Sequence, residues 1–393
     1  MASINARAPL KRQGSSLKRQ PSLGQRNGAT TGEQPQTPKE VPWDMLDRCL
    51  LPIIFCHATS VVLGTILNVL RISQVSSLTL FIWLTIITMS AVLFYHNLTV
   101  RAAGKAVLIT GCDNRVGATI ARQLDGYGFT VFAGFDSKAG NPVAEQLKEE
   151  GSGRLHCLQL DVSSETQILA SSLYICENLP ENSNGLWAII NAAHYVALGE
   201  LEWIPYSVLR KSIDTNVLGT ARLIQIMLPL VRRAKGRIIN VTSGLARIAA
   251  PVRGIYCSSL TGLETLSTCL REELRPRGVD VVIVAPGEYT TGSGWLDDES
   301  LREQAKDMWS HLSREQQEEY GEEYFERAIR SLEKFTRGPD ADLTPVLKAL
   351  TDAVTRTFPL PRYTPVTRSE KIQALIAEHL PRSVYDIIYS RRF

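Results

Sequence analysis

Ser243 and Tyr256, thirteen residues apart, stand out as residues that could take part in proton transfer. A phenol has a reference pKa near 10, so an unaided tyrosine is a weak base at neutral pH. A positive charge one helical turn further on would share the same helix face and lower that pKa, but the residue there is Leu260. We therefore expect Tyr256 to donate a proton more readily than it accepts one.

A glycine-containing stretch at residues 105–124 predicts a strand, a tight turn and a helix. Glycines at such a turn let the backbone approach a pyrophosphate at a helix N-terminus, where free N–H groups and the helix dipole favour negative charge. The alternative is a strand-to-helix loop without a function.

The segments that must position these residues begin at Gly104, where short β-branched runs alternate with amphipathic helical stretches. Strands are predicted at residues 105–110, 130–135, 154–160, 186–191, 236–242 and 279–286. Such alternation is typical of a parallel sheet covered by helices on both faces. The expected fold class is α/β, a doubly wound Rossmann-type domain over residues 99–393.

Two apolar stretches, residues 50–70 and 75–95, precede this domain and contain no Asp, Glu, Lys or Arg. Each has about 21 residues, enough to cross a hydrocarbon core of roughly 30 Å. We predict a membrane anchor over residues 43–98, a transmembrane helical hairpin with both ends in the cytosol because Lys and Arg flank it. The alternative is a pair of buried helices within a soluble domain.

Composition excludes several other classes of protein. Residues 1–42 are polar and basic, which predicts a disordered tail. A net charge of +3 is too small to indicate a nucleic-acid partner. The seven cysteines form no C-x-x-C pair and have no histidine at ligand spacing, so we expect no metal site and reduced thiols, with a lumenal disulfide as the alternative.

Taken in order, the motifs between residues 104 and 370 resemble those of the short-chain dehydrogenase/reductase family. Its T-G-x-x-x-G-x-G turn is matched by Thr110, Gly111 and Gly117, with Arg115 at the middle glycine. The resemblance implies that NAD or NADP is bound by Thr110, Gly111, Arg115, Val116, Gly117, Asp136, Asp161, Val162, Asn191, Ala193, Tyr256, Pro286, Gly287 and Thr291.

The resemblance also implies a set of catalytic residues. Tyr256 would exchange a proton with the substrate oxygen, Ser243 would hydrogen-bond that oxygen, and Asn216 would hold a water in the proton relay. Leu260 stands where the family has a lysine. The chain most resembles the branch that holds membrane-bound hydroxysteroid, retinol and 3-hydroxybutyrate dehydrogenases. This branch implies a hydrophobic steroid or retinoid substrate and membrane lipid as a partner. It also implies location in the membrane of the endoplasmic reticulum, with the catalytic domain facing the cytosol. A homodimer is possible.

Several departures from the family pattern leave alternatives open. A left-handed backbone at Arg115 would cost roughly 1 to 2 kcal/mol, whereas its guanidinium could instead contact phosphate or face solvent. His194 either crowds the cofactor path or packs in the core. Asp136 favours NAD because it would accept from ribose hydroxyls and repel a 2'-phosphate, while Lys138 argues for NADP.

The activity itself has two rivals. One is a pseudoenzyme that binds dinucleotide or lipid as a sensor or scaffold, and the other is a lipid carrier that needs no dinucleotide. Trp295, Met308 and Trp309, in a charged helical insert at residues 295–335, either line a hydrophobic pocket or pack in the core. The end of the chain, residues 380–393, fits a bilayer surface or an ordinary tail helix.

Overall fold

The computed structural model of the chain describes residues 43–72, 74–248, 251–287, 295–333, 336 and 342–389. The predicted tail at residues 1–42 and the cofactor residue Thr291 lie outside this part of the chain.

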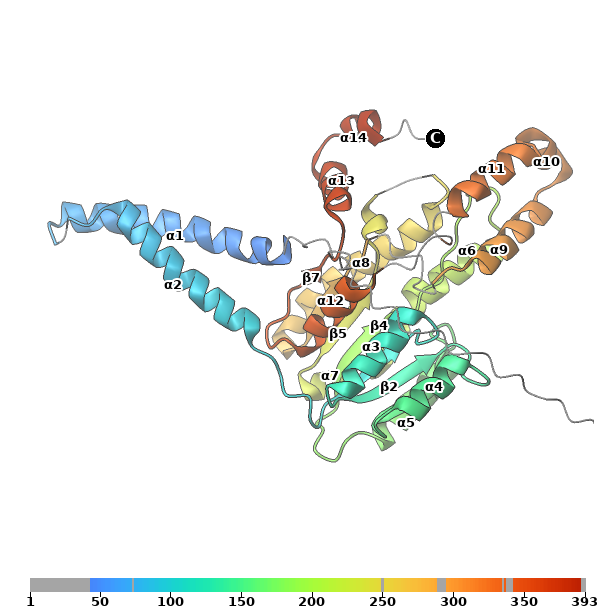
Figure 1. The fold of residues 1–393 in the computed structure, drawn as a ribbon, viewed down its shortest axis with the longest axis horizontal. Coiled ribbons are helices and arrows are strands. Elements are labelled where there is room, and N and C mark those ends of the chain that lie inside the picture. The colour runs from blue at the N-terminus through green and yellow to red at the C-terminus, as the bar shows by residue number, and fades with distance from the viewer. Residues whose placement is uncertain are drawn as a thin grey trace, which may run out of the picture. The chain divides into compact units, whose positions relative to one another are not determined.

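The α/β domain is built on a seven-stranded parallel sheet in the order β3-β2-β1-β4-β5-β6-β7. Figure 1 labels four of these strands, β2, β4, β5 and β7. The strands are β1 (Ala106–Thr110), β2 (Thr130–Phe135), β3 (Leu155–Gln159), β4 (Leu186–Asn191), β5 (Arg237–Val241), β6 (Asp280–Val284) and β7 (Arg362–Tyr363). The six predicted strands are confirmed. The seventh, β7, was not predicted, because two residues between prolines carry no periodic signal.

Helices cover both faces of the sheet, because successive side chains of β1 belong alternately to two different buried clusters. Val107 and Ile109 belong to one buried cluster, and Ala106 and Leu108 belong to the other. The first cluster includes residues of α3 (Arg115–Gly126), α4 (Pro142–Glu150) and α12 (Thr344–Thr355); the second includes residues of α5 (Glu165–Glu177), α7 (Thr220–Ala234) and α8 (Gly254–Leu274). The predicted doubly wound fold is confirmed.

A third apolar cluster surrounds Trp203, Tyr256 and Leu260. Its other walls come from the predicted helical insert, which forms α9 (Asp298–His311), α10 (Arg314–Tyr320) and α11 (Glu322–Leu332). Helix α6 (Tyr206–Ile213) leads into a π-helical turn, Asp214–Gly219, before α7. The chain ends with α13 (Arg368–His379) and α14 (Arg382–Tyr389).

Two long apolar helices, α1 (Trp43–Val69) and α2 (Ser77–Asn97), precede the domain. Their segments Cys49–Val69 and Ser77–Asn97 are long and apolar enough to cross a membrane, and α2 has no buried residue. This exposure does not fit a buried core position for α2, and the membrane anchor over residues 43–98 stays a prediction. Just after α2, the backbone N–H of Val100 donates to Thr355 O (2.7 Å), and Leu98 O accepts from Thr357 N–H (2.8 Å).

Candidate active site

The residues predicted from the sequence gather at the carboxyl edge of the sheet. Thr110 ends β1 and Asn191 ends β4, the two strands between which the strand order reverses. Ser243 follows β5, and Pro286 and Gly287 follow β6. In open α/β sheets a ligand binds beyond the carboxyl ends of the strands at such a reversal.

The turn after β1 brings two backbone segments into close contact. Gly111 has a φ of +70°, and a Cβ there would lie 2.6 Å from the Cα of Ala193. The hydroxyl of Thr110 accepts the backbone N–H groups of Ala192 and Ala193, each at 3.2 Å. Glycine is therefore required at position 111 for both the backbone angle and the space, and the turn fits a dinucleotide whose pyrophosphate approaches the backbone.

Helix α3 starts next to this turn. Arg115 is its first residue and its φ is not positive, so the left-handed strain considered for Arg115 does not arise. Its side chain is exposed. Asn114 caps the helix by accepting the N–H of Gly117 at 2.8 Å, and its amide donates to Ala192 O at 3.2 Å. Asn114 is not among the residues predicted from the sequence, although an asparagine before an amphipathic helix is a capping signal. Val116 and Gly117 are buried behind it.

A cavity of about 210 Å³ opens beside the turn. It is lined by Gly111, Asp113, Asn114, Asp136, Leu160, Asp161, Val162, Ser163, Ala193, His194, Tyr195, Lys211, Thr215 and Trp295. We call it the dinucleotide cleft. Five of the predicted cofactor residues line this one cleft: Gly111, Asp136, Asp161, Val162 and Ala193.

Three carboxylates face this cleft. Asp113 accepts the backbone N–H of Asp136 at 2.7 Å, and Asp161 accepts the backbone N–H of Ser163 at 2.8 Å. Partial burial, together with the charges of Asp161 and Asp113, raises the pKa of Asp136. Lys211 supplies a positive charge and lies over the ring of Tyr195, 4.5 Å from its centroid. Sequence analysis missed Asp113 and Lys211, which no local pattern marks.

His194 and Trp295 form another part of the cleft wall, with ring centroids 5.4 Å apart. Burial lowers the pKa of His194, so its imidazole is neutral at pH 7. His194 lines the cleft, and the hypothesis that it crowds the cofactor path stays a prediction. Trp295 lines the cleft and also packs against two of the buried clusters. Met308 packs in the core, and Trp309 lines a separate groove between α9 and α11.

Ser243 and Tyr256 meet in the interior, 4% and 8% exposed, and their side chains are hydrogen-bonded. Burial raises the pKa of the Tyr256 phenol above its usual value of 10, although Ser243 and the charge of Arg253 act in the opposite direction. Leu260, on the same helix, is 0% exposed and belongs to the same apolar cluster as Tyr256. The phenol is therefore neutral at pH 7.

Asn216 lies in the π-helical turn and is fully buried. Its amide donates to Tyr195 O and to the Ser259 hydroxyl, each at 3.0 Å, and its carbonyl accepts the N–H of Tyr195 at 2.8 Å. The side chain thus joins the cleft wall to the helix that carries Tyr256. Its role in a water relay stays a prediction.

The remaining predicted residues have structural contacts at the same edge. Asn191 donates to Asn240 Oδ1 at 2.7 Å, while its own Oδ1 has no hydrogen-bond partner in the described part of the chain. Pro286 O accepts the N–H of Gly244 at 2.6 Å, and Gly287 N–H donates to Pro365 O at 3.1 Å. The loop after β6 is therefore held against the segment that follows Ser243.

A parallel sheet with a dinucleotide cleft and a buried Ser–Tyr pair defines a Rossmann-type oxidoreductase. Residues 105–300 match the family model "short chain dehydrogenase". The chain belongs to the short-chain dehydrogenase/reductase family, which binds NAD(P).

Relatives with assigned activities cover most of the chain. It is 35% identical to the mitochondrial D-beta-hydroxybutyrate dehydrogenase of Mus musculus, over 75% of this chain and 86% of the relative. It is 36% identical to estradiol 17-beta-dehydrogenase 2 of Rattus norvegicus, over 74% of this chain and 75% of the relative. Retinol dehydrogenase 7 of Rattus norvegicus is 35% identical, over 66% of this chain and 80% of the relative.

Solved structures match the fold at lower identity. A short-chain dehydrogenase from Streptomyces avermitilis aligns with a TM-score of 0.55 and 18% identity, over 73% of this chain and 97% of that chain. A short chain dehydrogenase from Burkholderia cenocepacia in complex with NADP aligns with a TM-score of 0.53 and 19% identity, over 74% of this chain and 98% of that chain.

Proposed function

We propose that this protein is a membrane-anchored, NADH-dependent reductase that converts a hydrophobic ketone of the steroid or retinoid class to its secondary alcohol. The buried, neutral phenol of Tyr256 hydrogen-bonded to Ser243 is the observation that carries this proposal. Reduction adds a hydride to the carbonyl carbon and a proton to the oxygen, and bound NADH supplies the hydride. Tyr256 donates the proton, and Ser243 hydrogen-bonds the same oxygen.

The direction follows from the protonation of Tyr256. Alcohol oxidation needs its phenolate as a base, and burial disfavours that charged form. Ketone reduction needs the neutral phenol, which is already present at pH 7. Leu260 stands where the family has a lysine, which would stabilise the phenolate of Tyr256. Its absence should therefore slow alcohol oxidation more than ketone reduction.

Two features support the choice of substrate and cofactor. The side chains packed around Tyr256 include Val196, Leu198 and Leu260, which suit an apolar substrate better than a small carboxylate. Asp113, Asp136 and Asp161 in the cleft would repel the 2'-phosphate of NADPH, which favours NADH over NADPH. Lys211 in the same cleft and the neighbouring Lys138 are too few to reverse this balance of charge.

The anchor supports a lipid-soluble substrate. The apolar helices α1 and α2 suit a bilayer, into which steroids and retinoids partition. The positively charged flanks of this hairpin favour a catalytic domain on the cytosolic side, and the endoplasmic reticulum is the membrane we propose.

The test is turnover of NADH by the full-length protein in lipid nanodiscs with a panel of steroid ketones and retinoid carbonyl compounds. We expect ketone-dependent NADH oxidation that is lost in Tyr256→Phe and reduced in Ser243→Ala. Binding of NADH without turnover of any panel member would contradict the reductase and favour a dinucleotide-binding scaffold.

A further inference from the structure

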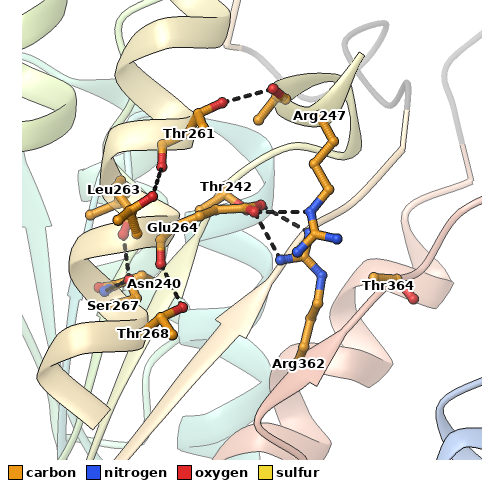
Figure 2. A network of polar contacts seen from close by, with 12 residues as sticks. Asn240, Thr242, Arg247, Thr261, Leu263, Glu264, Ser267, Thr268, Arg362 and Thr364 are labelled. Atoms are coloured by element: carbon orange, nitrogen blue, oxygen red, sulfur yellow. Dashed lines mark hydrogen bonds and ion pairs between the residues drawn. The ribbon is translucent and has the colours of Figure 1, made fainter. Parts of the chain in front are cut away.

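A cluster of charged and polar side chains joins α8 to Thr242, Arg247 and Arg362 (Figure 2). Its centre is Glu264 on α8, eight residues after Tyr256, with a side chain 9% exposed. Its two oxygens accept a bidentate pair of hydrogen bonds from Arg362, both at 2.9 Å. They also accept from the hydroxyl of Thr242 at 2.9 Å and from Arg247 Nε at 3.2 Å.

These four donors satisfy the carboxylate in a way that keeps it ionised. Burial by itself would raise the pKa of Glu264, but the hydrogen bonds and charges of Arg362 and Arg247, with the hydroxyl of Thr242, lower it overall. Bidentate arginine–carboxylate contacts fix direction as well as distance. The cluster is therefore a rigid connection between α8 and its partners.

The partners of Glu264 lie on both sides of the catalytic serine. Thr242 immediately precedes Ser243, and Arg247 ends the 3₁₀ turn, Gly244–Arg247, that immediately follows it. A further hydrogen bond lies between these two contacts in the sequence: the hydroxyl of Thr261 on α8 donates to Ala246 O at 2.7 Å. Residues 242–247, which include Ser243, are thus hydrogen-bonded to α8, the helix that carries Tyr256, through Thr242, Ala246 and Arg247.

The cluster also reaches the C-terminal part of the chain. Arg362 belongs to β7, and Arg247 forms an ion pair with Glu378 on α13. The N-terminal end of α13 contacts the cofactor-side loop, because a Cβ at Gly287 would lie 2.5 Å from the Glu370 carboxylate. Residues after position 360 therefore help to hold the segment that contains Ser243.

We infer that Glu264 is a positioning residue for the reaction: by binding Thr242 and Arg247 from α8, it sets the separation of Ser243 from Tyr256. This inference rests on the proposed function for its catalytic consequence. Glu264 does not line the dinucleotide cleft. Its loss should therefore affect proton transfer and leave dinucleotide binding in place.

The test compares two glutamates of the same helix in the full-length protein. Glu264→Gln keeps the shape and removes the charge. Glu272→Gln is the matched control, because Glu272 is exposed and pairs with the exposed Arg275 at 3.2 Å. Misplacing a catalytic group by about 1 Å costs up to about 100-fold, so we expect Glu264→Gln to lower kcat by about 10- to 100-fold, with the Kd for NADH within about twofold. Glu272→Gln should leave both unchanged.

A double-mutant cycle separates positioning from general damage. In a Ser243→Ala background, Glu264→Gln should lower kcat by less than about twofold further, because the serine it positions is gone. An equal loss of kcat in both backgrounds, or a loss of NADH affinity that matches the loss of kcat, would overturn the inference.

Hydrogen–deuterium exchange tests whether Glu264 holds residues 242–247 in place, even if no substrate turns over. Amides of residues 242–247 should exchange faster in Glu264→Gln than in Glu272→Gln, and equal exchange would overturn the inference whatever the outcome of the turnover test. If Glu264→Gln does not fold, Arg247→Gln removes only one of the four donors and should give a smaller increase in the same amides. No increase in that variant would equally refute the positioning role.

Discussion

Replacing Leu260 with lysine would place a positive charge one helical turn from Tyr256. Side chains at this spacing have Cβ atoms roughly 5–6 Å apart. Two unit charges about 6 Å apart interact by about 2.8 kcal/mol at an effective dielectric constant of about 20, which equals about two pKa units for the phenol. The fraction of phenolate at pH 7, and with it the rate of alcohol oxidation, should rise by about 100-fold.

The same substitution should destabilise the fold. Leu260 is 0% exposed, so lysine loses about 2 kcal/mol of apolar burial and brings a charge into an apolar cluster. We expect the free energy of unfolding to fall by about 2 to 4 kcal/mol. Urea unfolding measures this loss, and Leu260→Met serves as the control because it changes the shape but adds no charge.

The deciding quantity is the ratio of the oxidation rate to the reduction rate at pH 7, measured with saturating cofactor on the folded fraction. The ratio should rise by about 100-fold in Leu260→Lys and stay constant in Leu260→Met. A folded Leu260→Lys protein with an unchanged ratio would refute the argument that the missing charge sets the direction of the reaction.

Four further results are expected. Asn114→Ala removes the cap of α3 and should lower the free energy of unfolding by about 1 kcal/mol in chemical denaturation, with weaker NADH binding. Asp136→Ser removes a carboxylate from the cleft and should improve the affinity for NADPH relative to NADH by about tenfold in calorimetry. An unchanged ratio of the two affinities would mean that other residues set the preference for NADH. Because the pKa of Tyr256 is raised, the reduction rate should be nearly constant between about pH 6 and pH 9 while the oxidation rate keeps rising. The pKa of Glu264 is lower in the folded protein than its usual 4.5, so its stabilisation is complete above that pH and is lost as the pH falls below it; unfolding curves of Glu264→Gln should lack this acid-dependent loss.

The sheet and the position of the site could be predicted from local patterns. Strands β1 to β6 are short, largely apolar runs between helical stretches, and parallel strands bring their carboxyl ends to one edge. Thr110, Gly111 and Asn191 reach that edge because each lies at or just after a strand end.

The missed residues depend on contacts between distant segments. Glu264 and Arg362 are 98 residues apart, and Arg247 and Glu378 are 131 apart, so no window of sequence relates them. Lys211 on α6 lines the cleft together with Tyr195, which follows β4 and lies 16 residues earlier in the chain. A left-handed backbone was one alternative for Arg115, because the family has glycine there, but α3 begins at that residue and gives it a helical backbone.

The most direct test of the central claim is calorimetric titration of the detergent-solubilised full-length protein with NADH and NADPH, with Gly111→Trp as the blocked variant. A side chain at position 111 would collide with Ala193 in the turn beside the cleft. We predict micromolar binding of NADH, weaker binding of NADPH, and loss of both in Gly111→Trp. Binding of neither dinucleotide to the unmodified protein would contradict the assignment of this site to a nicotinamide cofactor.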